Sequence, residues 1–191
     1  MKLEKPVIIA LCGKSASGKS TIQKALAEEY PVHKIISCTT RPPREGEIDG
    51  VDYHFLTEDE FLAGSLNGDF LETAQFRGWY YGTRKQDISN EISVGVFNPQ
   101  GLKSLDRFRN QYLIVPVYIK LPLLERLKRS YRREGKLKKE YFRRAFTDFI
   151  DFWKIRKWLM WDINYEAIRT PPFAAHLIFE HIYYDILKNE E

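Results

Sequence analysis

The sequence predicts an α/β fold built on a parallel sheet, and three observations lead to that prediction. Residues 5–12 form an apolar run with proline near its start and glycine after its end, which is typical of a strand buried on both faces. Residues 19–30 carry apolar side chains at four-residue spacing, which predicts an amphipathic helix. Residues 33–37 form a second short apolar strand. A strand, a helix and a strand in this order begin a parallel sheet.

The later part of the chain resumes this alternation after an interruption. Residues 38–56 are rich in Pro, Gly and charge, which predicts turns. A small α+β insert follows, and its helix opens with a capping box formed by Thr57 and Glu60. Beyond the insert the expected strands are 92–97, 112–119 and 164–170, and the expected helices are 99–110, 122–135, 138–161 and 173–187.

Length and composition indicate one globular domain. The chain has 191 residues, of which 43% are hydrophobic and 29% are charged, so it can bury a core of ordinary size. No run of about 18 apolar residues occurs, so we expect no transmembrane helix. Two cysteines are too few for a disulfide framework, and this favours a reducing cytoplasm.

A phosphate-binding loop lies between the first predicted strand and helix. Gly13, Gly18, Lys19 and Ser20 satisfy the pattern G-x-x-x-x-G-K-[ST] in the context that this pattern requires. Its backbone N–H groups and the helix N-terminus hold phosphate, Lys19 reaches the β- and γ-phosphates, and the Ser20 hydroxyl binds Mg²⁺. We therefore expect a three-layer fold of the P-loop NTPase type with ATP and Mg²⁺ as cofactors. The expected ATP-binding residues are Gly13, Lys14, Ser15, Ala16, Ser17, Gly18, Lys19, Ser20 and Thr21.

Two stretches of the insert then point to an acceptor. SCTTRPPREGEIDGVDYHF (37–55) and GDFLETAQFRGWYYGT (68–83) occur in this order behind the phosphate loop. Together they resemble the guanylate kinase family over Lys5 to Thr83, and the resemblance fades after that. It implies a nucleoside monophosphate kinase that transfers the γ-phosphoryl group of Mg·ATP to GMP or dGMP.

The acceptor phosphate is expected to meet two arginines and two tyrosines. Arg41 and Arg44 lie three residues apart on a loop braced by prolines, and two guanidinium groups can grip a phosphate dianion. The resemblance assigns this role to both arginines, with Arg41 also catalytic. Tyr53 and Tyr81 would add phenolic donors to the same phosphate.

The base is expected to meet Ser37 and Glu72. An ionised carboxylate only accepts hydrogen bonds, so Glu72 suits the adjacent N1–H and amino donors of guanine and repels the N1 acceptor of adenine. Ser37, with Thr83 as a second candidate, would donate to O6. An unpaired buried polar group can discriminate by roughly 10⁴-fold.

A basic segment late in the chain predicts a lid over ATP. Residues 120–157 hold fourteen Lys and Arg against five Asp and Glu, which would attract polyanions. Nucleic-acid binding is the less favoured interpretation. The family closes its site with one arginine in the lid and one on the following helix, and here Arg132 or Arg133 would be the first and Arg144 the second. All three are therefore expected to be catalytic.

One stretch departs from the family. The family pattern D-x-D-x-Q-G is replaced by residues 96–101, in which Val96 and Asn98 stand for the two aspartates. Asn98 is still expected to bind substrate, but it can donate as well as accept. A kinase for another purine or deoxynucleoside monophosphate, for example a virus-encoded one, therefore stays an alternative. A binding module without catalysis is a further alternative, which the intact phosphate loop disfavours.

The expected organisation is one domain over residues 1–191 that binds small nucleotides. Aromatic residues crowd the C-terminal third, which indicates core packing or an oligomer face, so a homodimer stays open. The core is expected to comprise residues 1–38, 84–128 and 145–191, with the acceptor-binding insert at 39–83 and the lid at about 129–144.

Overall fold

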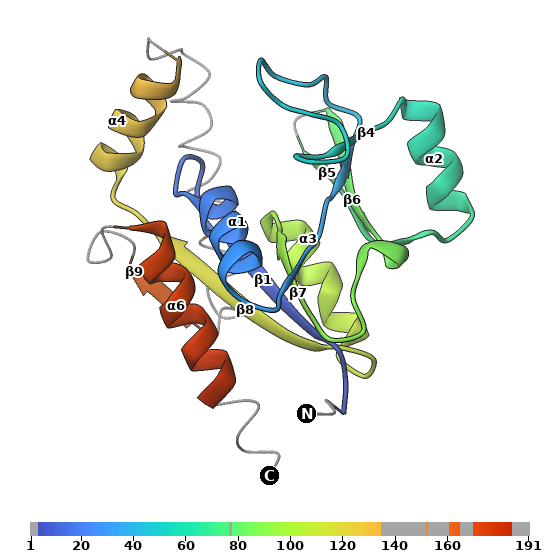
Figure 1. Ribbon diagram of the computed structural model, residues 1–191. Helices are drawn as coiled ribbons and strands as arrows, with labels where there is room; N and C mark the ends of the chain where they lie inside the picture. Colours follow the sequence, from blue (N-terminus) through green and yellow to red (C-terminus); the bar gives the residue numbers. More distant parts are fainter. Residues whose placement is uncertain (1–3, 77, 135–151, 153–160, 165–169, 185–191) are drawn as a thin grey trace.

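The computed structural model describes residues 4–76, 78–134, 152, 161–164 and 170–184. Five parallel strands form the central sheet, and the predicted α/β fold with a parallel sheet is confirmed (Figure 1). Every neighbouring pair of strands runs in the same direction. In sheet order the strands are β2 (His33–Lys34), β7 (Ile92–Val96), β1 (Val7–Cys12), β8 (Leu113–Lys120) and β9 (Trp161–Asn164).

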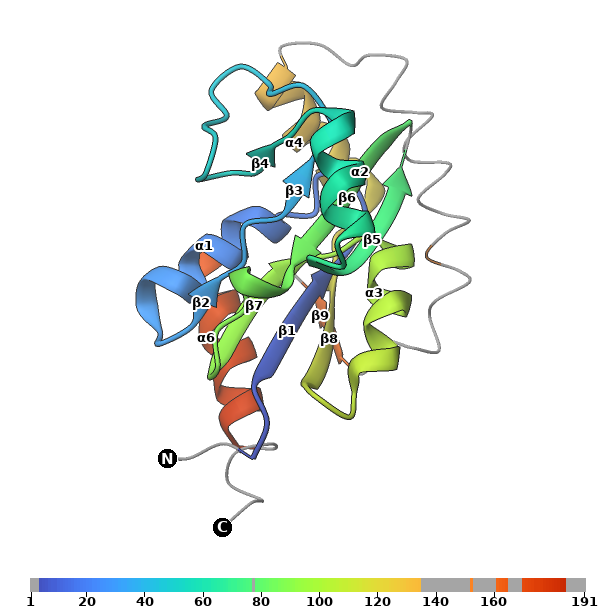
Figure 2. The ribbon, with the colours of Figure 1, turned by 90° about the vertical axis from the view of Figure 1, so that its right-hand side faces the viewer.

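Helices cover both faces of this sheet, as Figure 2 shows. On one face, alternate side chains of β1 pack with α1 (Lys19–Glu29) and α6 (Pro171–Ile182) in one hydrophobic cluster. The intervening side chains of β1 pack on the other face with α3 (Pro99–Leu105). Because strand side chains alternate between faces, a strand buried on both sides must be apolar throughout, which explains the run that predicted it.

A second, mixed sheet stands beside the first. Its strand order is β4 (His54–Phe55), β3 (Cys38–Thr39), β6 (Trp79–Arg84) and β5 (Phe70–Phe76), with α2 (Glu58–Leu66) packed on it. The predicted capping box of α2 is confirmed, because Thr57 and Glu60 bond each other's backbone N–H groups. The Phe61 ring of α2 stacks on Phe70 and Tyr80 and forms the small core of this part.

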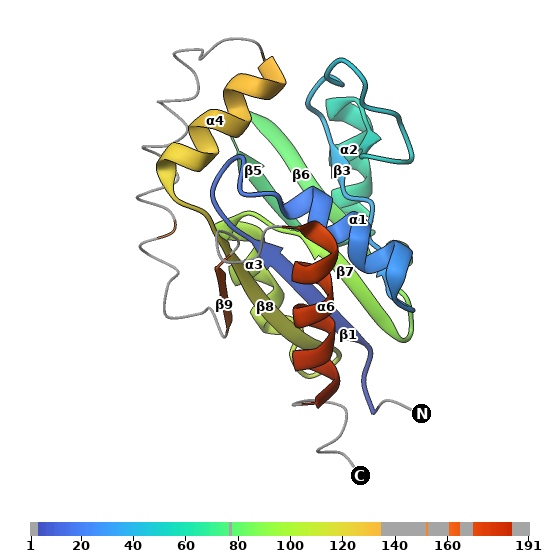
Figure 3. The ribbon, with the colours of Figure 1, turned by 60° about the vertical axis from the view of Figure 1, so that its left-hand side comes forward.

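Two elements of the chain complete the region above the central sheet. Helix α4 (Leu123–Glu134) follows β8 and lies across the phosphate loop from the second sheet (Figure 3). Short 3₁₀ turns, η1 (Lys85–Asp87) and η2 (Asp106–Phe108), connect strands and helices. The carboxyl ends of β1, β7 and β8 therefore lie on the side of the central sheet where α4 and the second sheet stand (Figures 1 and 3).

Several boundaries differ from the sequence-based expectation. The helix expected at 99–110 ends at Leu105, and the 3₁₀ turn η2 follows it. Strand β2 ends at Lys34, and Cys38–Thr39 belongs to the second sheet, so residues 33–37 are not one strand. The last described strand, Trp161–Asn164, pairs with Val117–Lys120 of β8 and begins before the strand expected at 164–170, of which residues 165–169 lie outside the described residues. Trp161, expected at the end of a helix, instead begins a strand.

Other expectations fall wholly or partly outside the described residues. This holds for nearly all of the helix expected at 138–161 and for the second half of the expected lid. Residues 129–134, the first part of that lid, lie within α4. The division into core, insert and lid stays a prediction. Within the described part of the chain, no helix is long and apolar enough to cross a membrane.

Candidate active site

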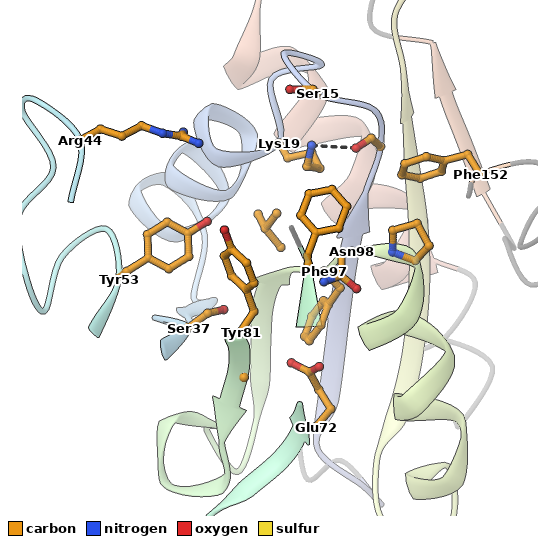
Figure 4. A pocket seen from close by; sticks show the side chains of 15 residues that line it. Ser15, Lys19, Ser37, Arg44, Tyr53, Glu72, Tyr81, Phe97, Asn98 and Phe152 are labelled. Carbon is orange, nitrogen blue, oxygen red and sulfur yellow. Dashed lines mark hydrogen bonds between the residues drawn. The ribbon is translucent and has the colours of Figure 1, made fainter. Parts of the chain in front are cut away.

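The candidate site lies where the order of the strands changes direction. From β1 the chain passes to β2 on one side, and it later passes from β7 to β8 on the other side of β1. In open parallel sheets, ligands bind beyond the carboxyl ends of the strands at such a switch point. Here the loop after β1 and the second sheet enclose one pocket (Figure 4). Nine residues that the sequence predicts for the site line this pocket: Gly13, Ser15, Lys19, Ser37, Arg44, Tyr53, Glu72, Tyr81 and Asn98.

The phosphate loop has the tight backbone that its glycines predict. Gly18 has a φ of 98° and precedes α1 without any side-chain cap, so its helix N-terminus is open to an anion. A side chain at Gly13 would place its Cβ 2.6 Å from the Ile119 carbonyl oxygen, which leaves room for glycine alone. The Lys19 ammonium donates to the carbonyl oxygens of Gly13 at 2.8 Å and Lys14 at 3.2 Å.

Two residues of the loop carry features that the motif does not predict. Ala16 has a φ of 62°, a left-handed conformation that costs an L-residue about 1–2 kcal/mol. The Ser17 hydroxyl is fully buried and has no hydrogen-bond partner among the described residues. Strain and an unsatisfied polar group both concentrate at functional sites, so they agree with a loop shaped for a ligand.

Helix α4 contributes two arginines that the sequence-based selection missed. The Arg126 Nη1 atom lies 3.5 Å from the Ser15 carbonyl oxygen, and the Arg129 Nη1 atom lies 3.5 Å from that of Ser17. Arg126 is buried and also donates to the Leu121 carbonyl oxygen. Their three-residue spacing places both side chains on one face of the helix. That spacing is the feature of the sequence from which their shared position could have been predicted.

Of the selected lid arginines only Arg132 has a described side chain, and it is not among the residues that line the pocket. Arg132 is exposed in the last turn of α4. The side chain of Arg133 and the whole of Arg144 lie outside the described residues. The assignment of a lid arginine thus stays a prediction.

The acceptor end of the pocket brings together three phosphate-binding candidates. Figure 4 shows the hydroxyl groups of Tyr53 and Tyr81 directed toward one another, with Arg44 reaching in the direction of Lys19. The two tyrosine rings meet edge to face with centroids 6.3 Å apart. Burial raises the pKa of Tyr53, and the neighbouring Tyr81 raises it further. The Tyr53 hydroxyl therefore keeps its proton and stays a hydrogen-bond donor at neutral pH. Ser37 lines the same side of the pocket.

Arg41 is held by a residue that the sequence-based selection missed. Its Nη2 atom donates to both carboxylate oxygens of Glu47 at 2.9 and 3.0 Å. The guanidinium also lies over the Tyr53 ring, 5.4 Å from its centroid. The same carboxylate accepts from the backbone N–H of Arg44 at 2.7 Å. Glu47 therefore orders the loop that carries both arginines.

Glu72 occupies the floor of the pocket, where a local irregularity aims it. The register of β5 against β6 shifts between Phe70 and Glu72, and such a bulge re-aims side chains. Glu72 thereby faces Thr83, whose hydroxyl donates to its Oε1 atom at 2.9 Å. Glu72 is 6% exposed, and its burial raises its pKa from 4.5 to about 7, against the hydrogen bond from Thr83, which lowers it.

Thr83 supports Glu72 from behind. It is fully buried and is not among the residues that line the pocket. Because its one proton is donated to Glu72, Thr83 orients the carboxylate in this structure, and a direct bond to a base has no support here.

Asn98 begins helix α3 at the edge of the same pocket. Its Oδ1 atom accepts from the Gly101 backbone N–H at 2.8 Å, and Pro99 occupies the first helical position. This is the usual arrangement of a helix N-cap. Val96, at the end of β7, also lines the pocket.

The described residues offer no carboxylate cluster for a metal ion. No group of three or more His, Cys, Asp or Glu among them could hold one. Ser20 lies in the exposed first turn of α1, beside the open helix N-terminus. A hydroxyl there fits Mg²⁺, which keeps several waters and is usually bound through substrate phosphates rather than by a protein cage.

Comparisons with known proteins agree with this geometry. Residues 4–149 match the model of a family described as guanylate kinase. A guanylate kinase of Chlamydia felis is 36% identical over 137 residues, which cover 68% of this chain and 66% of that protein. One of Symbiobacterium thermophilum is 34% identical over 165 residues, covering 83% and 76%.

Solved structures show the same fold. The guanylate kinase of Anaplasma phagocytophilum superposes with a TM-score of 0.71 at 24% identity, covering 97% of this chain and 88% of that one. A shikimate kinase of Acinetobacter baumannii, with a TM-score of 0.52 at 12% identity, shares the fold alone. The family match spans most of the chain, well beyond the first 83 residues. The chain belongs to the guanylate kinase family.

Proposed function

We propose that the protein transfers the γ-phosphoryl group of Mg·ATP to the phosphate of GMP or dGMP, giving ADP and the nucleoside diphosphate. One observation carries the proposal. The loop of Lys19 faces Arg44 and the paired tyrosines across one pocket, whose floor is the buried carboxylate of Glu72. A donor phosphate, an acceptor phosphate and a purine base each have matching groups in a single space.

The chemistry follows from charge and position. An oxygen of the acceptor phosphate attacks the γ-phosphorus, the bond to the β–γ bridging oxygen breaks, and ADP leaves with that oxygen. Lys19 exchanges its bonds to two loop carbonyls for the transferring phosphoryl group, whose charge it neutralises. Arg41 and Arg44 hold the acceptor in line. Ser20, together with the nucleotide, would hold Mg²⁺, which would supply further charge neutralisation.

The remaining site residues have supporting roles in this proposal. Residues 13–21 bind ATP, and Ser37, Tyr53, Tyr81 and Asn98 bind the acceptor. A lid that includes Arg132, Arg133 and Arg144 excludes water. Cys12 and Cys38 are buried, and a reducing cytoplasm is the setting that we propose for the enzyme.

The proposal is tested by following ADP release with Mg·ATP against GMP, dGMP, AMP, dAMP, IMP, CMP, UMP and dTMP. We expect turnover with GMP and dGMP, and none with the pyrimidines. Turnover with pyrimidine monophosphates alone would contradict the assignment of Glu72 to the base. ATP binding without any turnover would favour the alternative of a binding module.

Glu47 gives a prediction about the acceptor site. Replacing Glu47→Gln removes the charge that holds Arg41, and a hydrogen bond to a charged group contributes about 1.5–3 kcal/mol. The KM for GMP should therefore rise roughly tenfold or more, while the KM for ATP stays unchanged. The matched control is Glu45→Gln, at an exposed position on the same loop. Equal kinetics of the two variants would show that Glu47 does not position Arg41.

A further inference from the structure

Thr39 ends strand β3 and is fully buried, but it does not line the pocket. Its hydroxyl donates to the Tyr80 carbonyl oxygen of β6 at 3.0 Å and accepts from the Arg41 backbone N–H at 3.2 Å. Because a hydroxyl has one proton and free lone pairs, it can make both bonds at once. Thr39 therefore joins the beginning of the loop that carries Arg41 and Arg44 to the neighbouring strand.

Thr40 attaches the chain to the same residue of β6. Its Oγ1 atom accepts from the Tyr80 backbone N–H at 3.0 Å, and its own N–H donates to the Tyr80 carbonyl oxygen at 3.1 Å. The pairing of β3 with β6 ends at Thr39 and Tyr81, so these bonds continue the attachment by one residue beyond the ladder. Both backbone polar groups of Tyr80 are thereby paired with the two threonines.

Both attached points lie next to groups that the proposed function assigns to the acceptor phosphate. Arg41 is one of the two arginines, and its guanidinium lies over the Tyr53 ring. Tyr80 directly precedes Tyr81, whose hydroxyl is directed toward that of Tyr53 (Figure 4). The Tyr80 ring stacks on Phe61, so this residue is also held by the small core of the second sheet. The Arg41 backbone is thus tied to a well-anchored point beside Tyr81.

The two bonds of the Thr39 hydroxyl are not equivalent. If the hydroxyl is removed, the Tyr80 carbonyl oxygen keeps its bond from the Thr40 N–H. The Arg41 N–H loses the acceptor that the structure gives it, and a partly buried donor without a partner is costly. The chain would relieve that cost by moving Arg41 toward water or another acceptor. A change at Thr39 is therefore felt mainly at Arg41.

We propose that Thr39 is a positioning residue for the acceptor phosphate, because its hydroxyl holds Arg41 in a fixed place relative to Tyr81. The inference rests on the proposed kinase function. A phosphate-binding group that is already ordered loses less freedom when the ligand binds, so the pre-arranged guanidinium increases affinity for the acceptor. The effect is confined to the phosphate of the acceptor, since both bonds of the hydroxyl lead to Arg41 and Tyr80.

The test replaces Thr39→Val, which keeps the branched shape of the side chain and removes the hydroxyl. Thr39→Ser keeps the hydroxyl and serves as the rescue. Thr73→Val makes the same change at a half-buried position on β5 of the same sheet, outside the pocket lining, and serves as control. Melting temperatures verify that each variant is folded, and Thr39→Ala replaces the valine variant if that one is not.

The first readouts are the KM values for GMP and ATP. For Thr39→Val we expect KM for GMP to rise about tenfold while KM for ATP stays unchanged. Thr39→Ser and Thr73→Val should stay within about threefold of wild type for both substrates. A role in folding alone would lower the melting temperature and leave KM for GMP unchanged. A KM for GMP in Thr39→Val within about threefold of wild type, or an equal rise in Thr39→Ser or Thr73→Val, would overturn the inference.

Binding of GMP and guanosine separates the phosphate from the rest of the ligand. Because guanosine has no phosphate, Thr39→Val should weaken the binding of GMP about tenfold and leave that of guanosine unchanged. An equal loss for both ligands would mean that Thr39 supports the base site or the fold, which contradicts the inference. If GMP binds and no monophosphate is phosphorylated, the proposed function fails, and the dissociation constants decide the inference by the same limits. If the wild-type protein does not bind GMP, both fail.

Discussion

Replacing Glu72→Gln is expected to lower kcat/KM for GMP by roughly two to four orders of magnitude, because the acceptor for the guanine donors is lost. The glutamine side chain keeps an oxygen for the Thr83 hydroxyl, so the fold of the β5–β6 hairpin should be retained. Its NH₂ group then opposes N1–H and the 2-amino group. KM for ATP should change little, since Glu72 lies at the far end of the pocket from the phosphate loop.

The same replacement is expected to stabilise the fold above pH 7. Burial raises the pKa of Glu72 from 4.5 in the unfolded chain to about 7 in the folded protein. The folded state thus binds the proton more tightly, so this contribution to stability is complete below about pH 4.5 and is lost as the pH rises through 7. Above pH 7 the charged, buried carboxylate costs about 3 kcal/mol, and glutamine removes that cost.

Urea unfolding at about pH 5 and pH 8 measures this difference. The free energies of unfolding of wild type and Glu72→Gln should be similar at the lower pH and diverge at the higher one, with the variant more stable. Glu91→Gln, an exposed glutamate, should show no such divergence. A variant that is less stable than wild type at pH 8 would mean that Glu72 is satisfied as an anion in the folded protein.

A pH profile of activity gives an independent measure of the same group. Only the ionised carboxylate accepts both guanine donors, so kcat/KM for GMP should rise with pH through an apparent pKa near 7. In Glu72→Gln the residual activity should lack this transition. A transition that persists in the variant belongs to another group.

The sequence predicts much of this site because its motifs are local. The loop around Lys19 is defined by glycines whose positions follow from backbone geometry, and Gly18 indeed has a positive φ. Arg44, Tyr53 and Tyr81 come from two separate stretches, and the family resemblance predicts that all three bind one phosphate. The structure brings these three residues to one pocket.

Other features depend on contacts that no short pattern encodes. The contact between Glu47 and Arg41 depends on how one loop folds back on itself. The hydrogen bond from Thr83 to Glu72 depends on the pairing of β5 with β6 and on the bulge in β5. The orientation of Asn98 is an intermediate case. Asparagine directly before proline is a recognisable helix N-cap, so its amide could have been oriented from the sequence.

The errors in the predicted bounds of strands and helices have a physical cause as well. A two-residue strand such as Cys38–Thr39 carries too little periodicity to be assigned to one sheet or the other. The aromatic spacing before Trp161 matches a helix, whereas the pairing with β8 makes Trp161 a strand residue. Tertiary pairing overrides local preference at both places.

Replacing Lys19→Met is expected to lower kcat by at least about 10³-fold while the KM for GMP changes little. Methionine has nearly the same length and no charge, so it removes the neutralisation of the transferring phosphoryl group. In the absence of nucleotide, Lys19 also bonds the carbonyl oxygens of Gly13 and Lys14, and losing these bonds costs about 1 kcal/mol each. The melting temperature should therefore fall by a few degrees without unfolding the protein.

Single-turnover kinetics separate the two effects of Lys19, because they report the chemical step apart from binding. Lys24→Met, on the exposed face of the same helix, removes an equal charge and its ion pair with Glu28, and should keep wild-type turnover. A kcat for Lys19→Met within tenfold of wild type would show that Lys19 shapes the loop without contacting the reacting phosphate. Since both loop carbonyls lose their donor in either case, only the rate of the chemical step distinguishes a catalytic lysine from a structural one.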